Sequence, residues 1–169
     1  MTLSHQEFTD DHTPIAFFIT FRTYGTWLHG DERGSVDRVH NRYGTPRLPA
    51  NKLRQQYELK LLKQPPVWLT ATQREVVTKA IKETCKERNW GLWAINARTT
   101  HVHIVVTADC NSKQTRATLK AKATKAMREN GCWSSDLSPW ARRGSRQNLW
   151  TYQDLIVAIE YVLYEQGED

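Results

Sequence analysis

The segment from residue 99 to residue 106 most constrains what this chain can fold into. It reads TTHVHIVV, a short run of β-branched residues with two histidines at alternate positions. Successive side chains of a β-strand point to opposite faces, so His101 and His103 share one face and Val102 and Ile104 share the other. The sequence therefore predicts a strand with an apolar side facing a core and a polar side on which two imidazoles converge.

A histidine pair of this kind is half of a metal site. A divalent metal binds imidazole nitrogens at roughly 2.0–2.2 Å and leaves positions for a third ligand, water or substrate. The alternative is two surface histidines on a half-exposed strand, which is the commoner meaning of an isolated His-x-His. Residues elsewhere in the chain must decide between these interpretations.

The charge balance points to a polyanionic partner. The 169 residues include 24 Lys and Arg against 18 Asp and Glu, a net charge of +6. Such an excess attracts nucleic acid without specifying a fold. The chain also contains seven Trp, and flat side chains near cations can stack on unpaired bases. Nucleic acid is the leading predicted partner.

The cysteines and the apolar runs predict the compartment. The three cysteines show no Cys-x-x-Cys spacing, which disfavours a disulfide framework or a zinc ribbon. Residues 1–13 lack the basic-then-apolar pattern of a signal peptide. No apolar run approaches the roughly 20 residues that a membrane span needs. We expect a cytoplasmic protein with no membrane partner.

Hydrophobic periodicity and turn residues predict the order of elements. Strands are expected at 14–23, 91–99 and 101–108, with a hairpin or edge strand at 140–150. Helices are expected at 70–88, 112–130 and 152–166, the first capped by Thr70 or Thr72. Residues 25–66 form a loop-rich insertion with one short helix at 53–62, and its Trp27-to-Gly34 stretch is expected to shape a substrate groove.

This order predicts an α+β fold of the split βαβ, or ferredoxin-like, type within a single domain spanning 14–166. One antiparallel sheet has helices packed on one face, and the opposite face is left free for a site.

The last predicted helix carries a candidate nucleophile. Its apolar stripe is Leu155, Ile159, Val162 and Leu163, and Tyr161 lies off it. A tyrosine hydroxyl beside a metal-bound phosphate is a suitable nucleophile for strand cleavage, because the metal polarises the phosphoryl oxygen. The product would be a covalent phosphotyrosine.

Two neighbouring residues compete for the third metal position. Glu165 lies one turn beyond Tyr161 on the same helix face, whereas Gln166 falls nearer the packed face. Tyr164, three residues after Tyr161, is a rival nucleophile.

His101-Val102-His103 on an apolar strand, the preceding strand at 14–23 and Tyr161 on a late helix together resemble the single-tyrosine HUH transposases of small insertion sequences, especially those associated with repetitive extragenic palindromes. The resemblance spans residues 14–166. It implies a ferredoxin-like endonuclease and strand transferase that uses Mg²⁺ or Mn²⁺ and cleaves single-stranded DNA beside a hairpin through a 5′-phosphotyrosine.

By this resemblance His101 and His103 are metal ligands and Tyr161 is the nucleophile. The family commonly has Gln or Asn four residues after the tyrosine, where this chain has Glu165, and Gln166 comes five after it. Gln166 is slightly favoured as third ligand, because Gln-Gly resembles the family's ending, although helix spacing favours Glu165. One tyrosine makes one covalent link per chain, so moving two DNA ends requires a homodimer or two rounds of reaction.

Two basic segments are predicted to hold the DNA through its phosphates. The helix at 112–130 carries six Lys and Arg against one carboxylate, and the segment at 140–150 places arginines between Trp140 and Trp150. The predicted DNA-binding residues are Lys113, Arg116, Lys120, Lys122, Lys125, Arg142, Arg143 and Arg146.

Two other functions remain open at this point. One is a non-catalytic protein that recognises DNA hairpins. The other is an RNA-binding ferredoxin-like module whose basic face and aromatic residues read unpaired bases, which leaves the histidine pair unexplained.

Overall fold

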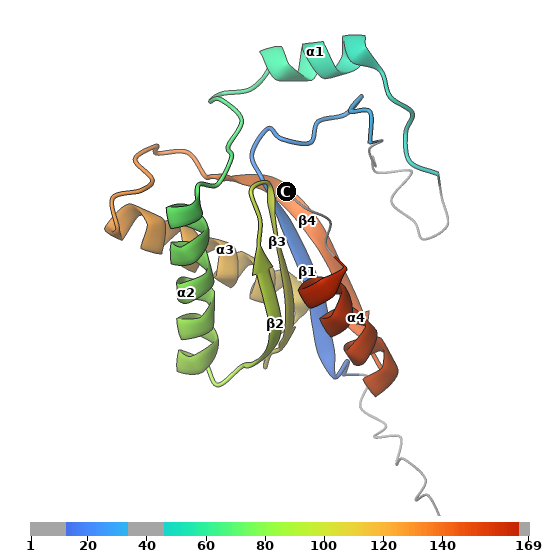
Figure 1. The fold of residues 1–169 in the computed structure, drawn as a ribbon, viewed down its shortest axis with the longest axis vertical. Helices are drawn as coiled ribbons and strands as arrows, with labels where there is room; N and C mark the ends of the chain where they lie inside the picture. Colours follow the sequence, from blue (N-terminus) through green and yellow to red (C-terminus); the bar gives the residue numbers. More distant parts are fainter. Residues whose placement is uncertain (1–12, 34–45, 166–169) are drawn as a thin grey trace, which may run out of the picture.

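The structure is a computed structural model that describes residues 13–33 and 46–165 (Figure 1). Within these ranges it is an α+β fold with one four-stranded antiparallel sheet and four helices. The strands are β1 (Ala16–Thr23), β2 (Gly91–Ala97), β3 (His101–Thr107) and β4 (Trp140–Leu149), in the spatial order β2-β3-β1-β4. All four predicted strands are therefore confirmed, and β4 is an edge strand.

The helices are α1 (Lys52–Lys60), α2 (Ala71–Glu87), α3 (Ser112–Glu129) and α4 (Tyr152–Tyr164). Each begins after a residue whose side chain accepts a hydrogen bond from a backbone N–H three residues on, which satisfies a donor that the helix cannot. Of the two N-caps predicted for α2, Thr70 and Thr72, Thr70 is the one found. Gly131, at φ +70°, follows the end of α3.

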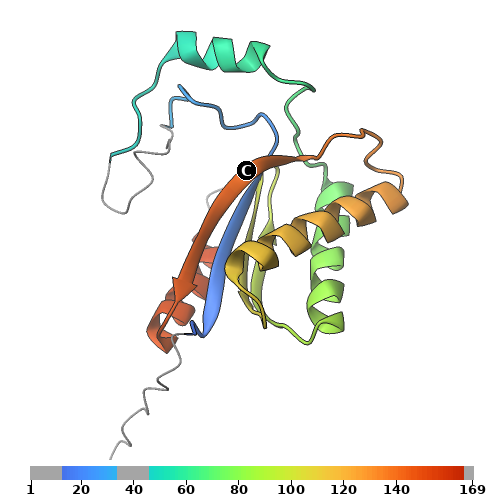
Figure 2. The ribbon, with the colours of Figure 1, turned by 180° about the vertical axis from the view of Figure 1, so that it is seen from behind.

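Helices cover both faces of the sheet, on opposite sides in the two views (Figures 1 and 2). On one face, apolar side chains of α2 and α3 pack against β1 and β3, where Ile19 and Ile104 are fully buried. On the other face, Leu155 and Val162 of α4 pack against Val105 of β3. The expectation that this second face is free is wrong: α4 covers part of it.

The buried stripe of α4 is narrower than its sequence suggests. Leu155, Ala158 and Val162 are buried, whereas Leu163 is 45% exposed. A lone helix on a sheet face contacts it along one line, so apolar residues at the stripe's edge stay in solvent.

Helix α1, in the insertion after β1, stands apart from the sheet. Helix α1 has no buried residue and lies beyond one end of the strands, at the top of Figure 1. In the part of the chain that the structure describes, no helix has the length and apolar character of a membrane span.

Candidate metal and nucleophile site

The two histidines of β3 lie side by side on the face that α4 covers. Their ring centroids are 4.5 Å apart and their planes cross at 73°. His103 is 8% exposed and His101 is half-buried. The convergence predicted from strand alternation is therefore confirmed.

A threonine hydroxyl contacts the Nδ1 atom of each histidine. Thr20 Oγ1 of β1 lies 2.7 Å from His103 Nδ1, and Thr100 Oγ1 lies 3.0 Å from His101 Nδ1. A hydrogen bond at one ring nitrogen fixes the orientation of an imidazole whose other nitrogen binds metal. With the proton on Nδ1, Nε2 of each ring carries the lone pair that a metal takes.

Tyr161 of α4 reaches the histidine pair. Its ring centroid is 5.7 Å from that of His103 and 5.8 Å from that of Phe18, both in edge-to-face geometry. Phe18 of β1 also lies 5.6 Å from His103. Tyr161 is 38% exposed, so its ring touches the site and remains open to a substrate.

Both ends of α4 are anchored, which determines where Tyr161 lies. At the start, Thr151 and Asp154 form a capping box. The hydrogen bonds from Thr151 hold the pKa of Asp154 below its usual value. At the end, the Asn96 side chain of β2 donates to the Val162 carbonyl oxygen at 3.1 Å. Asn96 also pairs with His103 across β2 and β3. The position of α4 is therefore tied to the strand position that holds His103.

The two candidates for the third metal ligand are Glu165 and Gln166. The described residues contain no group of three His, Cys, Asp or Glu side chains that could hold a metal, so Glu165 does not join the histidines in such a group. Glu165 is the exposed C-cap of α4, and its backbone N–H donates to the Tyr161 carbonyl oxygen. Gln166 lies outside the described residues.

The donor set nevertheless fits part of a divalent metal site. Neutral imidazole nitrogens bind transition metals and Zn²⁺ well, and the two rings are adjacent and oriented by Thr20 and Thr100. The two histidines fit two coordination positions and leave the others to a further side chain, water or a phosphate oxygen.

The basic residues of α3 lie on the opposite side of the sheet from the histidines, and two of them contact β4 directly (Figure 2). Arg116 donates to the Gly144 carbonyl oxygen at 2.7 Å. Lys120 donates to the carbonyl oxygens of Ala141 and Arg143 at 2.7 and 2.9 Å. These two cations hold the edge strand against the helix, a role that counting charges does not reveal.

The surroundings of Lys120 change its proton affinity. Burial, followed by the positive charge of Arg116, lowers the pKa of Lys120 to about 8. On its other side, Gly144 allows β4 to lie close to β1, because a side chain there would collide with the Thr20 carbonyl oxygen.

The other predicted DNA-binding residues are mostly at the surface. Lys113, Lys125, Arg142, Arg143 and Arg146 are exposed and Lys122 is half-buried. Lys125 pairs with Glu129 at 3.6 Å, and Arg146 donates to the Ser112 hydroxyl at 3.3 Å.

Sequence reasoning missed Thr20, Phe18, Asn96 and Arg22. Thr20 pairs with His103, and Arg22 pairs with His101, across β1 and β3. The side chains of these two residue pairs therefore lie on one face of the sheet. No sequence signal marks Thr20 and Arg22, because the register of two strands some 80 residues apart selects them, and Asn96 is selected by the register of β2 on β3. Phe18 was assigned only to a strand, and its contact with Tyr161 depends on the position of α4.

The chain shows a distant likeness to known proteins in structure but not in sequence. No protein-family model and no curated protein sequence matches the chain. A solved structure of a REP-associated tyrosine transposase bound to a REP hairpin is similar to it, with 13% sequence identity and a TM-score of 0.48, over 96% of this chain and 70% of that one.

Proposed function

We propose that this protein is a metal-dependent single-stranded DNA endonuclease and strand transferase. His101 and His103 would hold a Mg²⁺ or Mn²⁺ ion, and Tyr161 is the nucleophile. The observation that carries this proposal is the contact between the Tyr161 ring and the histidine pair. A phenol and two oriented imidazoles from different elements are what phosphoryl transfer through a covalent intermediate requires.

The reaction exchanges one phosphodiester for another. The Tyr161 hydroxyl oxygen bonds to phosphorus and gives up its proton, the bond from phosphorus to the 3′ oxygen breaks, and that oxygen leaves as a 3′-hydroxyl. The 5′ phosphate remains on Tyr161, and attack by a 3′-hydroxyl reverses the step and joins strands. The bound cation supplies charge stabilisation at the phosphoryl oxygens.

The substrate we propose is single-stranded DNA containing a hairpin. Two features support this choice: the net charge of +6, and the resemblance of the His-x-His strand and late tyrosine to the single-tyrosine HUH transposases. We also propose that the sheet order β2-β3-β1-β4, with α2 and α3 on one face, is the ferredoxin-like arrangement of that family.

Covalent capture tests the proposal. The protein is incubated with 5′- or 3′-labelled hairpin DNAs that carry single-stranded flanks, with Mn²⁺, Mg²⁺ or EDTA, and the products are separated under denaturing conditions. We expect a metal-dependent protein–DNA band that retains the label on the 3′ side of the break and disappears in Tyr161→Phe.

Tyr164→Phe is the matched control, because Tyr164 lies in the same helix turn and is 80% exposed. It should form adduct like the wild type. Adduct that persists in Tyr161→Phe and is lost in Tyr164→Phe would overturn the assignment of the nucleophile. Hairpin binding with no adduct in any metal would favour the non-catalytic binding protein instead.

A further inference from the structure

Beside the histidine pair, three arginines gather on a single tryptophan. The guanidinium carbon atoms of Arg22, Arg33 and Arg47 lie 3.5, 4.4 and 5.4 Å from the ring centroid of Trp27. Arg22 is the last residue but one of β1, Trp27 and Arg33 follow it in the loop, and Arg47 comes later in the insertion. We call these four residues the arginine–tryptophan cluster.

We infer that the arginine–tryptophan cluster is a phosphate-binding site, and that it holds a backbone phosphodiester of the single-stranded DNA flank as it enters the histidine pair. The inference rests on the proposed function for the identity of the ligand. The site itself rests on charge, geometry and position.

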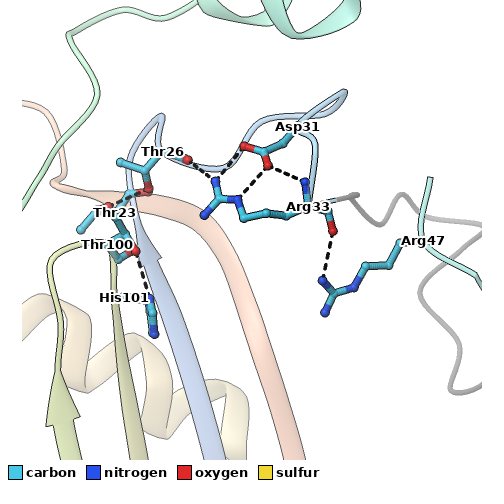
Figure 3. A network of polar contacts seen from close by, with 7 residues as sticks. All are labelled: Thr23, Thr26, Asp31, Arg33, Arg47, Thr100 and His101. Atoms are coloured by element: carbon cyan, nitrogen blue, oxygen red, sulfur yellow. Dashed lines mark hydrogen bonds and ion pairs between the residues drawn. The ribbon is translucent and has the colours of Figure 1, made fainter. Parts of the chain in front are cut away.

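The cluster concentrates positive charge that its carboxylates only partly offset. Asp31 is buried and pairs with Arg33 through two hydrogen bonds of 2.7 Å (Figure 3). Those hydrogen bonds hold the pKa of Asp31 below its usual value. Glu32, which is exposed, also acts on Arg33. With Arg33 matched to Asp31 among the described residues, Arg22 and Arg47 add positive charge that can attract an anion.

Burial and the nearby positive charges lower the proton affinity of Arg22. Burial, followed by the positive charges of Arg47 and Arg33, lowers the pKa of Arg22 to about 10. An anion placed among the guanidinium groups would offset both the desolvation and the repulsion. Arginine is also suited to the task, because its planar fork can donate two parallel hydrogen bonds to one phosphate.

The cluster lies next to the histidines in the sheet register. Arg22 pairs with His101 across β1 and β3, which places the two side chains as neighbours on one face. The adjacent loop is tied to the same point: the Thr23 backbone N–H and hydroxyl donate to the Thr100 carbonyl oxygen at 2.8 and 3.1 Å, and Thr100 Oγ1 contacts His101 (Figure 3). A DNA strand whose phosphate is bound at the arginine–tryptophan cluster would lie next to the proposed metal site.

A neutral-linkage scan tests the inference without cleavage. Hairpin DNAs whose flank carries one methylphosphonate at each linkage in turn are bound to the full chain in EDTA, and affinity is measured by fluorescence anisotropy. In the wild type we expect one or two linkages at which the neutral group weakens binding about tenfold. In Arg22→Gln and Arg47→Gln, binding is already weaker and those linkages have no further effect.

Salt dependence provides an independent readout. Loss of one phosphate contact lowers the slope of log affinity against log salt concentration by about one, and a general loss of folding does not produce this change. Arg88→Gln is the matched control, because Arg88 also lies over a tryptophan, 5.3 Å from the Trp90 ring, at the end of α2. It should leave the slope and the linkage pattern unchanged.

Arg47→Gln is the cluster variant least at risk of misfolding, because Arg47 is exposed and its guanidinium group is the farthest of the three from the Trp27 ring. The inference would be overturned if, in both Arg22→Gln and Arg47→Gln, each neutral linkage still weakened binding as much as it does in the wild type. If the wild type bound no hairpin DNA, the proposed function would fail. The site would then be tested by whether inorganic phosphate raises the thermal stability of the protein. Thermal stabilisation of the wild type and Arg88→Gln, but not of Arg47→Gln, would support a phosphate site, and equal responses would overturn it.

Discussion

The two faces of the sheet use the same strands for different purposes. On the face covered by α2 and α3, Val102, Ile104 and Val106 of β3 are fully buried in the larger apolar cluster. On the face covered by α4, the alternating positions of the same strand hold His101 and His103 against Phe18 and Tyr161. One seven-residue strand thus serves the core and the proposed site together.

The cations follow the same division. On the α3 side, Lys120 and Arg116 are occupied by backbone carbonyl oxygens of β4. At the end of the other face, Arg22 and Arg47 gather over Trp27 with one buried carboxylate among them. Equal formal charges therefore have different uses: the first pair holds the fold together, and the second is placed to meet a ligand.

Removal of a proposed metal ligand should have the largest functional effect. We expect His103→Ala to eliminate metal-dependent adduct formation, because a single imidazole holds a divalent ion poorly. Its free energy of unfolding should fall by less than in a core truncation on the same strand. Chemical denaturation and the denaturing-gel assay measure the two effects. Wild-type adduct levels in this variant would remove His103 from the metal site.

The neighbouring residue should show the reverse pattern. Ile104 is fully buried, and truncation of such a side chain costs about 2–5 kcal/mol. We expect Ile104→Ala to lose stability in this range and to retain metal-dependent adduct at temperatures where it is folded. Urea unfolding monitored by tryptophan fluorescence gives the stability. A small loss here with a large loss in His103→Ala would reverse the assignment of the two faces.

The Thr20 hydroxyl should tune the site rather than create it. Thr20→Val keeps the shape of the side chain and removes the contact with His103 Nδ1. Loss of such an orienting partner typically weakens metal binding by about 10–100-fold. Titration of adduct formation with Mn²⁺ should therefore shift to higher concentration and approach the wild-type plateau. Thr124→Val, whose hydroxyl lies on the α3 face, should leave the titration unchanged.

The smallest predicted effect is the change in the pH dependence of stability when Lys120 is replaced. Its pKa of about 8 in the folded protein lies below the usual lysine value of 10.5. The unfolded chain therefore binds more protons above pH 8, and the contribution of Lys120 makes stability rise with pH there. In Lys120→Met this contribution is absent. Denaturation midpoints from pH 7.5 to 9, compared with the wild type, measure the difference, and parallel curves would contradict the assignment.

Local sequence signals account for most of the secondary structure. The cap at Thr70, the end of α3 before Gly131 and the strand over His101–Thr107 follow from hydrogen-bonding and periodicity rules that act within a few residues. The buried stripe of α4 was predicted less well, because Leu163 is apolar and yet faces solvent. Whether an apolar residue is buried depends on what the neighbouring element covers.

By itself, the sequence determined that His101 and His103 share one strand face, since alternation is a property of the extended backbone. It also determined that Tyr161 belongs to a helix. Only the tertiary structure brought Thr20 to His103 across 83 residues, Tyr161 to the same ring and Arg22 beside His101. Strand register and helix docking depend on packing of the whole chain, and local residue preferences do not specify them.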